Sequence, residues 1–216
     1  MRILFYGDSI TDMDRDRNAS GDDFRRGMGL GHGYVNFVAA ELLSKNPNGY
    51  EFINRGISGN RSVDLYARIK ADCWNHNPDV VSVLIGINDV YPQELENNGV
   101  ELDRFEKVYR MLIEDTKAKL PNVKMILCEP FLLPESTSEQ DMVKWTCQPG
   151  VLEYAATVKR LANEYGLPFV ALQKTLEERA AGNADCYVFD GIHPTPAGAK
   201  IIAEEWLKVF KDEIEK

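Results

Sequence analysis

The chain has 216 residues, of which 44% are apolar, and this is enough to bury the core of one domain. Its 34 acidic and 25 basic residues give a net charge of -9, which disfavours nucleic acid and anionic membrane surfaces as partners. The apolar start ends at Tyr6, too early for a signal peptide or a membrane span. The four cysteines lack the spacing of a zinc site. We therefore expect a single cytoplasmic domain over residues 1–216, with no metal.

Short apolar runs alternate along the chain with longer stretches of helical periodicity. This alternation is typical of βαβ units around a parallel sheet, so the sequence predicts an α/β fold. The expected strands are residues 3–6, 51–54, 80–85, 124–128 and 168–171. No internal repeat or linker divides the sequence, which supports one domain.

Four helices are expected between and after these strands, because apolar residues recur at helical spacing. They cover residues 35–43, 102–116, 155–165 and 196–210. The last helix has the clearest start, since Thr195 can cap it and Pro196 suits its first turn. Two long segments are expected to be loops with a functional role: residues 12–32, which are charged and rich in glycine, and residues 132–149.

Polar turns follow the first three expected strands. They are Gly7-Asp8-Ser9-Ile10-Thr11, Gly56-Ile57-Ser58-Gly59-Asn60 and Gly86-Ile87-Asn88-Asp89. Ligands of open parallel sheets bind beyond the carboxyl ends of the strands, where the strand order reverses. If the first strand is central, as in a flavodoxin-like order, these turns meet in one crevice. Ser9, Gly59 and Asn88 then become neighbours.

This trio suits a serine nucleophile. The backbone N–H groups of Ser9 and Gly59 and the side-chain amide of Asn88 can form an oxyanion hole. A serine hydroxyl also needs a base to take its proton. Among the three histidines we select His193, because it directly precedes the last expected helix in an irregular turn, where Asp190 can orient and stabilise the imidazole.

These motifs, in this order, resemble those of the SGNH/GDSL hydrolases over nearly the whole chain. Ile10 stands where the name GDSL implies leucine, which is a conservative change. The resemblance implies a three-layer α/β/α sandwich with a five-stranded parallel flavodoxin-like sheet. It also implies Ser9, Asp190 and His193 as catalytic residues, and Ser9, Gly59 and Asn88 as the oxyanion hole. Within the family, residues 31–35, 56–60 and 85–90 look most like the small intracellular acetylxylan esterases.

The expected reaction is therefore hydrolysis of short acyl esters through an acyl-enzyme on Ser9, without a cofactor. The loops near the site are charged and rich in glycine, which favours a small-molecule or oligosaccharide ester such as an O-acetyl group on xylo-oligosaccharides. Asp8, Tyr91 and Trp145 are predicted to contact the substrate, whereas His32 is expected to be a surface residue. The oligomeric state stays open, although the apolar and aromatic content would permit a homo-oligomer.

Several alternatives remain at this stage. The same motifs allow a short-chain thioesterase, an arylesterase or a lysophospholipase, because they specify the carbonyl chemistry and not the leaving group. A metal-dependent phosphohydrolase would use Asp12, Asp14 and Asp16, which could suggest a magnesium site, although their alternation with Met13 and the arginines predicts a solvated loop. A carbohydrate-binding module without turnover is a third possibility. Asp89 is expected to serve structure by accepting hydrogen bonds from nearby backbone N–H groups.

Overall fold

The structure is a computed structural model that describes residues 1–90, 98–133 and 139–215, with the side chains at 24, 25 and 139–147 left out. Its centre is one parallel sheet of five strands in the order β2-β1-β3-β4-β5. The strands are β1 (Arg2–Gly7), β2 (Glu51–Gly56), β3 (Val80–Leu84), β4 (Lys124–Cys128) and β5 (Phe169–Val170). The predicted α/β fold with a flavodoxin-like parallel sheet is confirmed, and each strand lies within two residues of its expected bounds.

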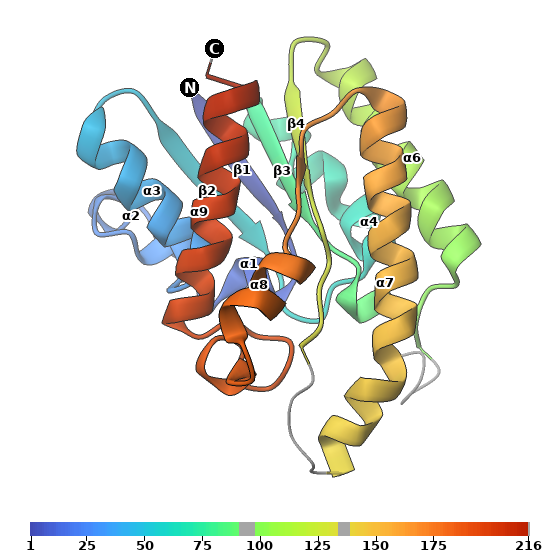
Figure 1. The fold of residues 1–216 in the computed structure, drawn as a ribbon. Coiled ribbons are helices and arrows are strands. Elements are labelled where there is room, and N and C mark those ends of the chain that lie inside the picture. Colours follow the sequence, from blue (N-terminus) through green and yellow to red (C-terminus); the bar gives the residue numbers. More distant parts are fainter. Residues whose placement is uncertain (91–97, 134–138, 216) are drawn as a thin grey trace.

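Helices cover both faces of this sheet (Figure 1). Helix α3 packs against α9 on one face, while α6 packs against both α4 and α7 on the other. The remaining helical segments are short. The bounds are α1 (Ser9–Asp12), α2 (Asp22–Arg25), η1 (Met28–Leu30), α3 (Tyr34–Lys45), α4 (Ser62–Asp72), η2 (Trp74–His76), α6 (Leu102–Lys119), α7 (Glu139–Tyr165), α8 (Gln173–Ala180), η3 (Ala184–Cys186) and α9 (Pro196–Glu213).

The central strand β1 shows how the core is divided between the two faces. Successive side chains of a strand point to opposite faces of the sheet. Phe5 accordingly contacts Tyr34 of α3 and Trp206 of α9, with ring centroids 5.7 and 5.2 Å apart. The neighbouring Tyr6 donates a hydrogen bond to the carbonyl of Leu65 in α4, at 2.5 Å. Burial on both faces explains why β1 is a continuous apolar run.

Three of the predicted helices, α3, α6 and α9, begin and end within three residues of their expected bounds, and Thr195 caps α9 by accepting a hydrogen bond from the Gly198 N–H. Two expectations are wrong. The predicted loop over residues 132–149 contains the start of α7, which runs through Pro149 from Glu139. The segment 12–32 contains α2 and η1 and is therefore not wholly a loop. Helices α4 and α8 were not expected, because each buries only a few side chains.

Within the part of the chain that the structure describes, no helix is both long and apolar enough to cross a lipid bilayer.

Candidate active site

The turn after β1 presents Ser9 at the carboxyl edge of the sheet. Ser9 is the first residue of α1, and Asp8 caps that helix by accepting a hydrogen bond from the Ile10 N–H at 2.9 Å. A side chain at position 7 could not fit, because its Cβ would lie 2.5 Å from the Leu84 carbonyl oxygen. Glycine at this position therefore allows the strand to turn sharply into the helix that carries Ser9.

Ser9 belongs to a hydrogen-bonded series with His193 and Asp190. The Ser9 hydroxyl oxygen lies 2.8 Å from His193 Nε2, and His193 Nδ1 lies 2.6 Å from Asp190 Oδ2. With Nδ1 donating to the carboxylate, Nε2 is the nitrogen that can accept the serine proton. The structure thus brings together the three residues predicted from the sequence, although Ser9 and His193 are 184 residues apart.

The turn around Asp190 fixes the position of the imidazole. Asp190 Oδ1 accepts hydrogen bonds from the backbone N–H groups of Ile192 and His193, at 2.9 and 2.7 Å. Partial burial acts to raise the pKa of Asp190, but the hydrogen bonds from His193 and Ile192 outweigh it and lower this pKa to about 2. Asp190 is therefore ionised at neutral pH and can stabilise an imidazolium at His193.

The predicted oxyanion hole combines groups from the turns after β1, β2 and β3, with Gly59 on the turn that follows β2. The Asn60 N–H donates to the Ile57 carbonyl, and Gly59 has a φ of 78°, a conformation that favours glycine in this turn position. Within the described residues, neither the Ser9 N–H nor the Gly59 N–H has a hydrogen-bond partner. The Asn88 amide donates to the Asn60 carbonyl at 3.0 Å and carries a second hydrogen for another acceptor.

Asp89 anchors the Asn88 turn to the start of α4. Its buried carboxylate accepts hydrogen bonds from the Ser62 N–H, at 3.0 and 3.1 Å, and from the Ser62 hydroxyl at 2.6 Å. Burial raises the pKa of Asp89 to about 7, against the opposing effect of these hydrogen bonds. The structural role predicted for Asp89 is confirmed, and it joins the segments that carry Asn88 and Gly59.

Arg68 is a second support, and no pattern in the sequence indicated it. From α4 its guanidinium donates to the Gly7 carbonyl at 3.1 Å, to the Arg55 carbonyl at 2.9 Å and to the Asn60 side chain at 2.7 Å. It also lies over the Tyr6 ring, 4.5 Å from the centroid. One cation therefore ties together the ends of β1 and β2. Recognising it would have required predicting α4, whose apolar stripe is weak.

Of the three residues predicted to contact substrate, the structure describes the side chain of Asp8 alone. Asp8 is only 1% exposed and lies beneath the site, so a direct substrate contact is wrong. Its role is to cap α1, and burial raises its pKa to about 7. Tyr91 lies outside the described residues, as does the side chain of Trp145.

The aspartates that suggested a magnesium site do not form one. Asp12 is buried, and its Oδ2 pairs with Arg17 at 2.6 Å and accepts a hydrogen bond from the Ser58 N–H at 3.2 Å. Asp14 is almost fully exposed, and Asp16 accepts a hydrogen bond from the Asn18 N–H. Over the described ranges, no three histidine, cysteine, aspartate or glutamate residues are arranged to hold a metal. The expectation that Asp12 is part of a solvated loop is wrong.

A cavity of about 220 Å³ opens above the Ser9 hydroxyl. Its lining residues are Ser9, Met13, Asp14, His32, Ser58, Phe189 and His193. His32 is exposed but faces this cavity, and Phe189 stacks beside the His193 ring with centroids 5.8 Å apart. Met13, Asp14 and Ser58 were not recognised as lining residues from the sequence. The cavity adds a recognition surface to the hydrogen-bonded series.

The fold and these side chains define a class: a serine hydrolase built on a parallel α/β sheet, with its reactive hydroxyl at the carboxyl edge. Residues 5–201 match the model of the GDSL-like lipase/acylhydrolase family, so the chain belongs to this family. The predicted resemblance is confirmed.

Individual relatives agree with this membership. The chain is 36% identical to an acetylxylan esterase of Geobacillus stearothermophilus, over 96% of the chain and 92% of that protein. It is 24% identical to an isoamyl acetate-hydrolyzing esterase of Saccharomyces cerevisiae, over 97% of the chain and 86% of that protein. A crystal structure of a putative GDSL-like lipase from Parabacteroides merdae aligns with a TM-score of 0.87 and 34% identity, covering 97% and 95% of the two chains. The prediction that the chain is an ester hydrolase is confirmed.

Proposed function

We propose that the chain removes short acyl groups, above all acetyl, from carbohydrate esters such as acetylated xylo-oligosaccharides. The observation that carries this proposal is the hydrogen-bonded series from Ser9 through His193 to Asp190, beneath a small open cavity. The series supplies an activated serine nucleophile, and the relative with 36% identity is named an acetylxylan esterase.

In the first half of the reaction, Ser9 Oγ attacks the ester carbonyl carbon while its proton passes to His193 Nε2. The negative charge moves to the carbonyl oxygen, which the Ser9 and Gly59 N–H groups and the Asn88 amide stabilise. The tetrahedral intermediate then collapses, and His193 returns the proton to the departing alcohol oxygen. The acyl group is left as an ester on Ser9.

In the second half, a water molecule attacks the acyl-enzyme. His193 takes one proton from this water, a second tetrahedral intermediate forms in the same oxyanion hole, and its collapse releases the carboxylic acid. The proton on His193 returns to Ser9 Oγ. Asp190 stays ionised throughout, since its pKa of about 2 lies far below neutral pH, and it stabilises each imidazolium.

The shape and polarity of the cavity support a short acyl group on a polar alcohol. Its volume of about 220 Å³ is small, and Asp14 and His32 bring polar groups to its rim. Phe189 is 59% exposed and can stack against the apolar face of a sugar ring. We therefore assign Asp14, His32 and Phe189 to the leaving-group side. The cytoplasmic location and a homo-oligomeric state remain predictions.

The decisive experiment measures acid release from acetylated xylo-oligosaccharides, other acetylated sugars, short acyl thioesters and a lysophospholipid. We expect kcat/KM to be highest for an acetylated sugar. Activity on 4-nitrophenyl acetate without activity on any acetylated sugar would overturn the carbohydrate assignment but keep the esterase chemistry. Preference for the thioester or the lysophospholipid would replace the substrate class.

A further inference from the structure

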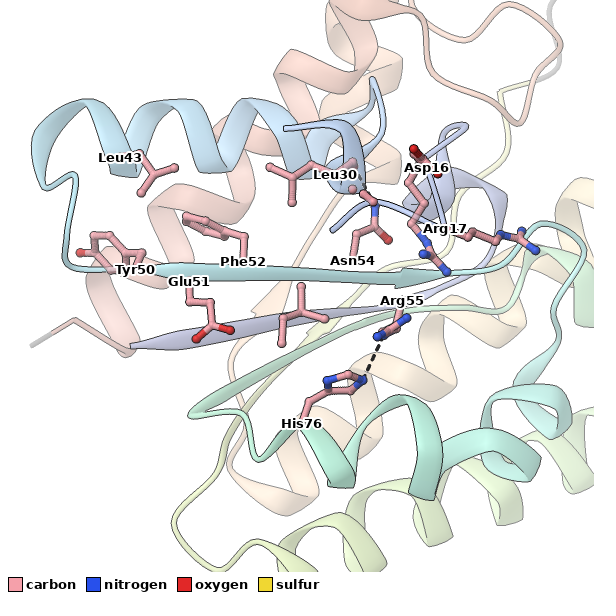
Figure 2. Close-up of a pocket in the computed structure, with 14 residues that line it drawn as sticks. Asp16, Arg17, Leu30, Leu43, Tyr50, Glu51, Phe52, Asn54, Arg55 and His76 are labelled. Atoms are coloured by element: carbon pink, nitrogen blue, oxygen red, sulfur yellow. Dashed lines mark hydrogen bonds between the residues drawn. The ribbon is translucent and has the colours of Figure 1, made fainter. Parts of the chain in front are cut away.

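A second, larger cavity lies along β2, the edge strand of the sheet, and shares no described lining residue with the catalytic cavity. Its volume is about 470 Å³, within the range of small-molecule sites. Figure 2 shows that its two ends differ: Leu43, Tyr50 and Phe52 lie near the start of β2, whereas Arg17 and Arg55 lie near its end. The cavity therefore has an apolar end and a cationic end.

The cationic end contains three guanidinium groups, in a chain whose net charge is -9. Arg15 is buried and donates its Nε–H to the Gly56 carbonyl at 3.0 Å, while its terminal nitrogens make no hydrogen bond within the described residues. Burial lowers the pKa of Arg15, Asp12 opposes this effect, and the positive charges of Arg55 and Arg17 lower it further. The three cations are close enough to repel one another, so an anion between them would be stabilised.

Arg55 is the least compensated of the three. Its Nε–H donates to His76 Nε2 at 3.1 Å, as Figure 2 shows, and across the described ranges it has no carboxylate partner. Because Nε2 accepts this bond, His76 is neutral, and burial followed by the charge of Arg55 lowers its pKa. The guanidinium of Arg55 thus faces the cavity beside a neutral ring.

The acidic groups that line the cavity are held by other partners. Glu51 pairs with Arg2 at 2.9 Å, and Asp16 accepts a hydrogen bond from the Asn18 N–H at 2.8 Å. Asp12, behind the cationic end, pairs with Arg17. These contacts leave Arg55 and the terminal nitrogens of Arg15 for a ligand.

We propose that this cavity binds a small organic anion, whose carboxylate or phosphate lies against Arg55 and Arg15. Phe52 and Arg55 point to opposite faces of β2, so the apolar body of the ligand crosses the edge of this strand toward Leu43 and Phe52. A planar anionic group matches the fork of a guanidinium, which favours bidentate hydrogen bonds. An aromatic or aliphatic body would cover Leu43 and the ring edge of Phe52. Binding at this site is independent of the acyl-transfer chemistry at Ser9.

The test titrates the full chain with benzoate, phenyl phosphate and inorganic phosphate, with benzyl alcohol as the neutral counterpart, by isothermal calorimetry. We expect saturable binding with one site for benzoate or phenyl phosphate, and at least tenfold weaker binding for benzyl alcohol. Arg55→Gln should weaken the binding of the anion at least tenfold, while Arg55→Lys should retain part of the affinity. Arg104→Gln, on an exposed arginine of α6, is the matched control and should change nothing.

A second variant separates the two ends. Leu43→Ala should weaken the binding of benzoate but leave the binding of inorganic phosphate unchanged, because phosphate has no apolar body. The proposal is overturned if no anion binds saturably, if benzyl alcohol binds as well as benzoate, or if Arg55→Gln retains full affinity while its melting temperature shows that it is folded. Ser9→Ala should bind the anion as the unaltered chain does, so the outcome does not depend on the esterase assignment.

Discussion

The active site has two layers of charged and polar groups, one partly exposed to solvent and one mostly buried. The upper layer is partly open to solvent and consists of Ser9, Gly59, Asn88, Asp190 and His193. The support layer lies beneath it and consists of Asp8, Asp12, Arg68 and Asp89, all buried except the half-buried Arg68.

The difference shows in the two kinds of carboxylate. Asp190, in the upper layer, has a pKa lowered to about 2 by its hydrogen bonds, so its charge is stable and serves the imidazolium. Asp89, in the support layer, has a pKa raised to about 7 by burial, so its charge is costly in the folded state. The upper layer supplies the groups that react, whereas the buried charges of the support layer lower the free energy of unfolding and hold the turns in place. Variants in the two layers should therefore differ in what they change.

The largest effect is expected in the upper layer from Ser9→Ala. Without the nucleophile, kcat on 4-nitrophenyl acetate should fall on the order of 10⁴-fold or more, while the melting temperature stays within a few degrees. Steady-state kinetics and calorimetry check both. Ser58→Ala removes another hydroxyl from the same cavity and should keep activity within about tenfold. Normal turnover in Ser9→Ala would reject the nucleophile.

A smaller loss is expected from Asn88→Ala. If the amide stabilises the oxyanion, kcat should fall by about 10² to 10³ with little change in KM. Asn163→Ala, at an exposed position on α7, serves as the control. An increase in KM with kcat unchanged would instead show that Asn88 binds the ground-state substrate.

Every residue of the upper layer was predictable from the sequence, since these residues lie in short turns directly after strands or before a helix. Asp190 and His193 are three residues apart, and the carboxyl-end rule for parallel sheets places Ser9, Gly59 and Asn88 together. The support layer was less accessible. Arg68 contacts the Gly7 carbonyl 61 residues away, from a helix with a weak apolar stripe.

The alternation of charges after Asp12 shows the same limit. In sequence it is typical of a solvated loop, but Arg15 and Arg17 fold back onto Asp12, at 3.7 and 2.6 Å, and allow it to be buried. Likewise Pro149 suggested a loop, yet α7 continues through it. Compensating contacts of this kind depend on the tertiary fold and leave no local pattern.

In the support layer, Asp89→Asn should change the pH dependence of stability. Between its unfolded value near 4 and its folded pKa of about 7, Asp89 keeps its proton in the folded chain but loses it in the unfolded chain. Raising the pH across this window therefore destabilises the unaltered chain, by up to about 4 kcal/mol at 1.4 kcal/mol per pKa unit. Asparagine cannot titrate, so the variant should lack this loss.

Urea unfolding of both chains between pH 4 and 8 measures the difference. Asp8, whose pKa burial also raises to about 7, is present in both chains, and its charge contributes to the raised pKa of Asp89, so the comparison measures Asp89 together with this coupling. Asp103→Asn, on an exposed aspartate of α6, should follow the unaltered chain. Parallel stability curves for Asp89→Asn and the unaltered chain would show that Asp89 is not the costly carboxylate.

The smallest effect is expected at the rim of the catalytic cavity, from Asp14→Asn. Asp14 has a φ of 54°, a left-handed conformation that asparagine tolerates, so the backbone should be preserved. A carboxylate that accepts hydrogen bonds from sugar hydroxyls should matter only for a sugar leaving group. We expect kcat/KM on acetylated xylo-oligosaccharides to fall about three- to tenfold, about the effect of one hydrogen bond, with no change on 4-nitrophenyl acetate. Equal losses on both substrates would mean that Asp14 supports the upper layer and does not recognise the alcohol.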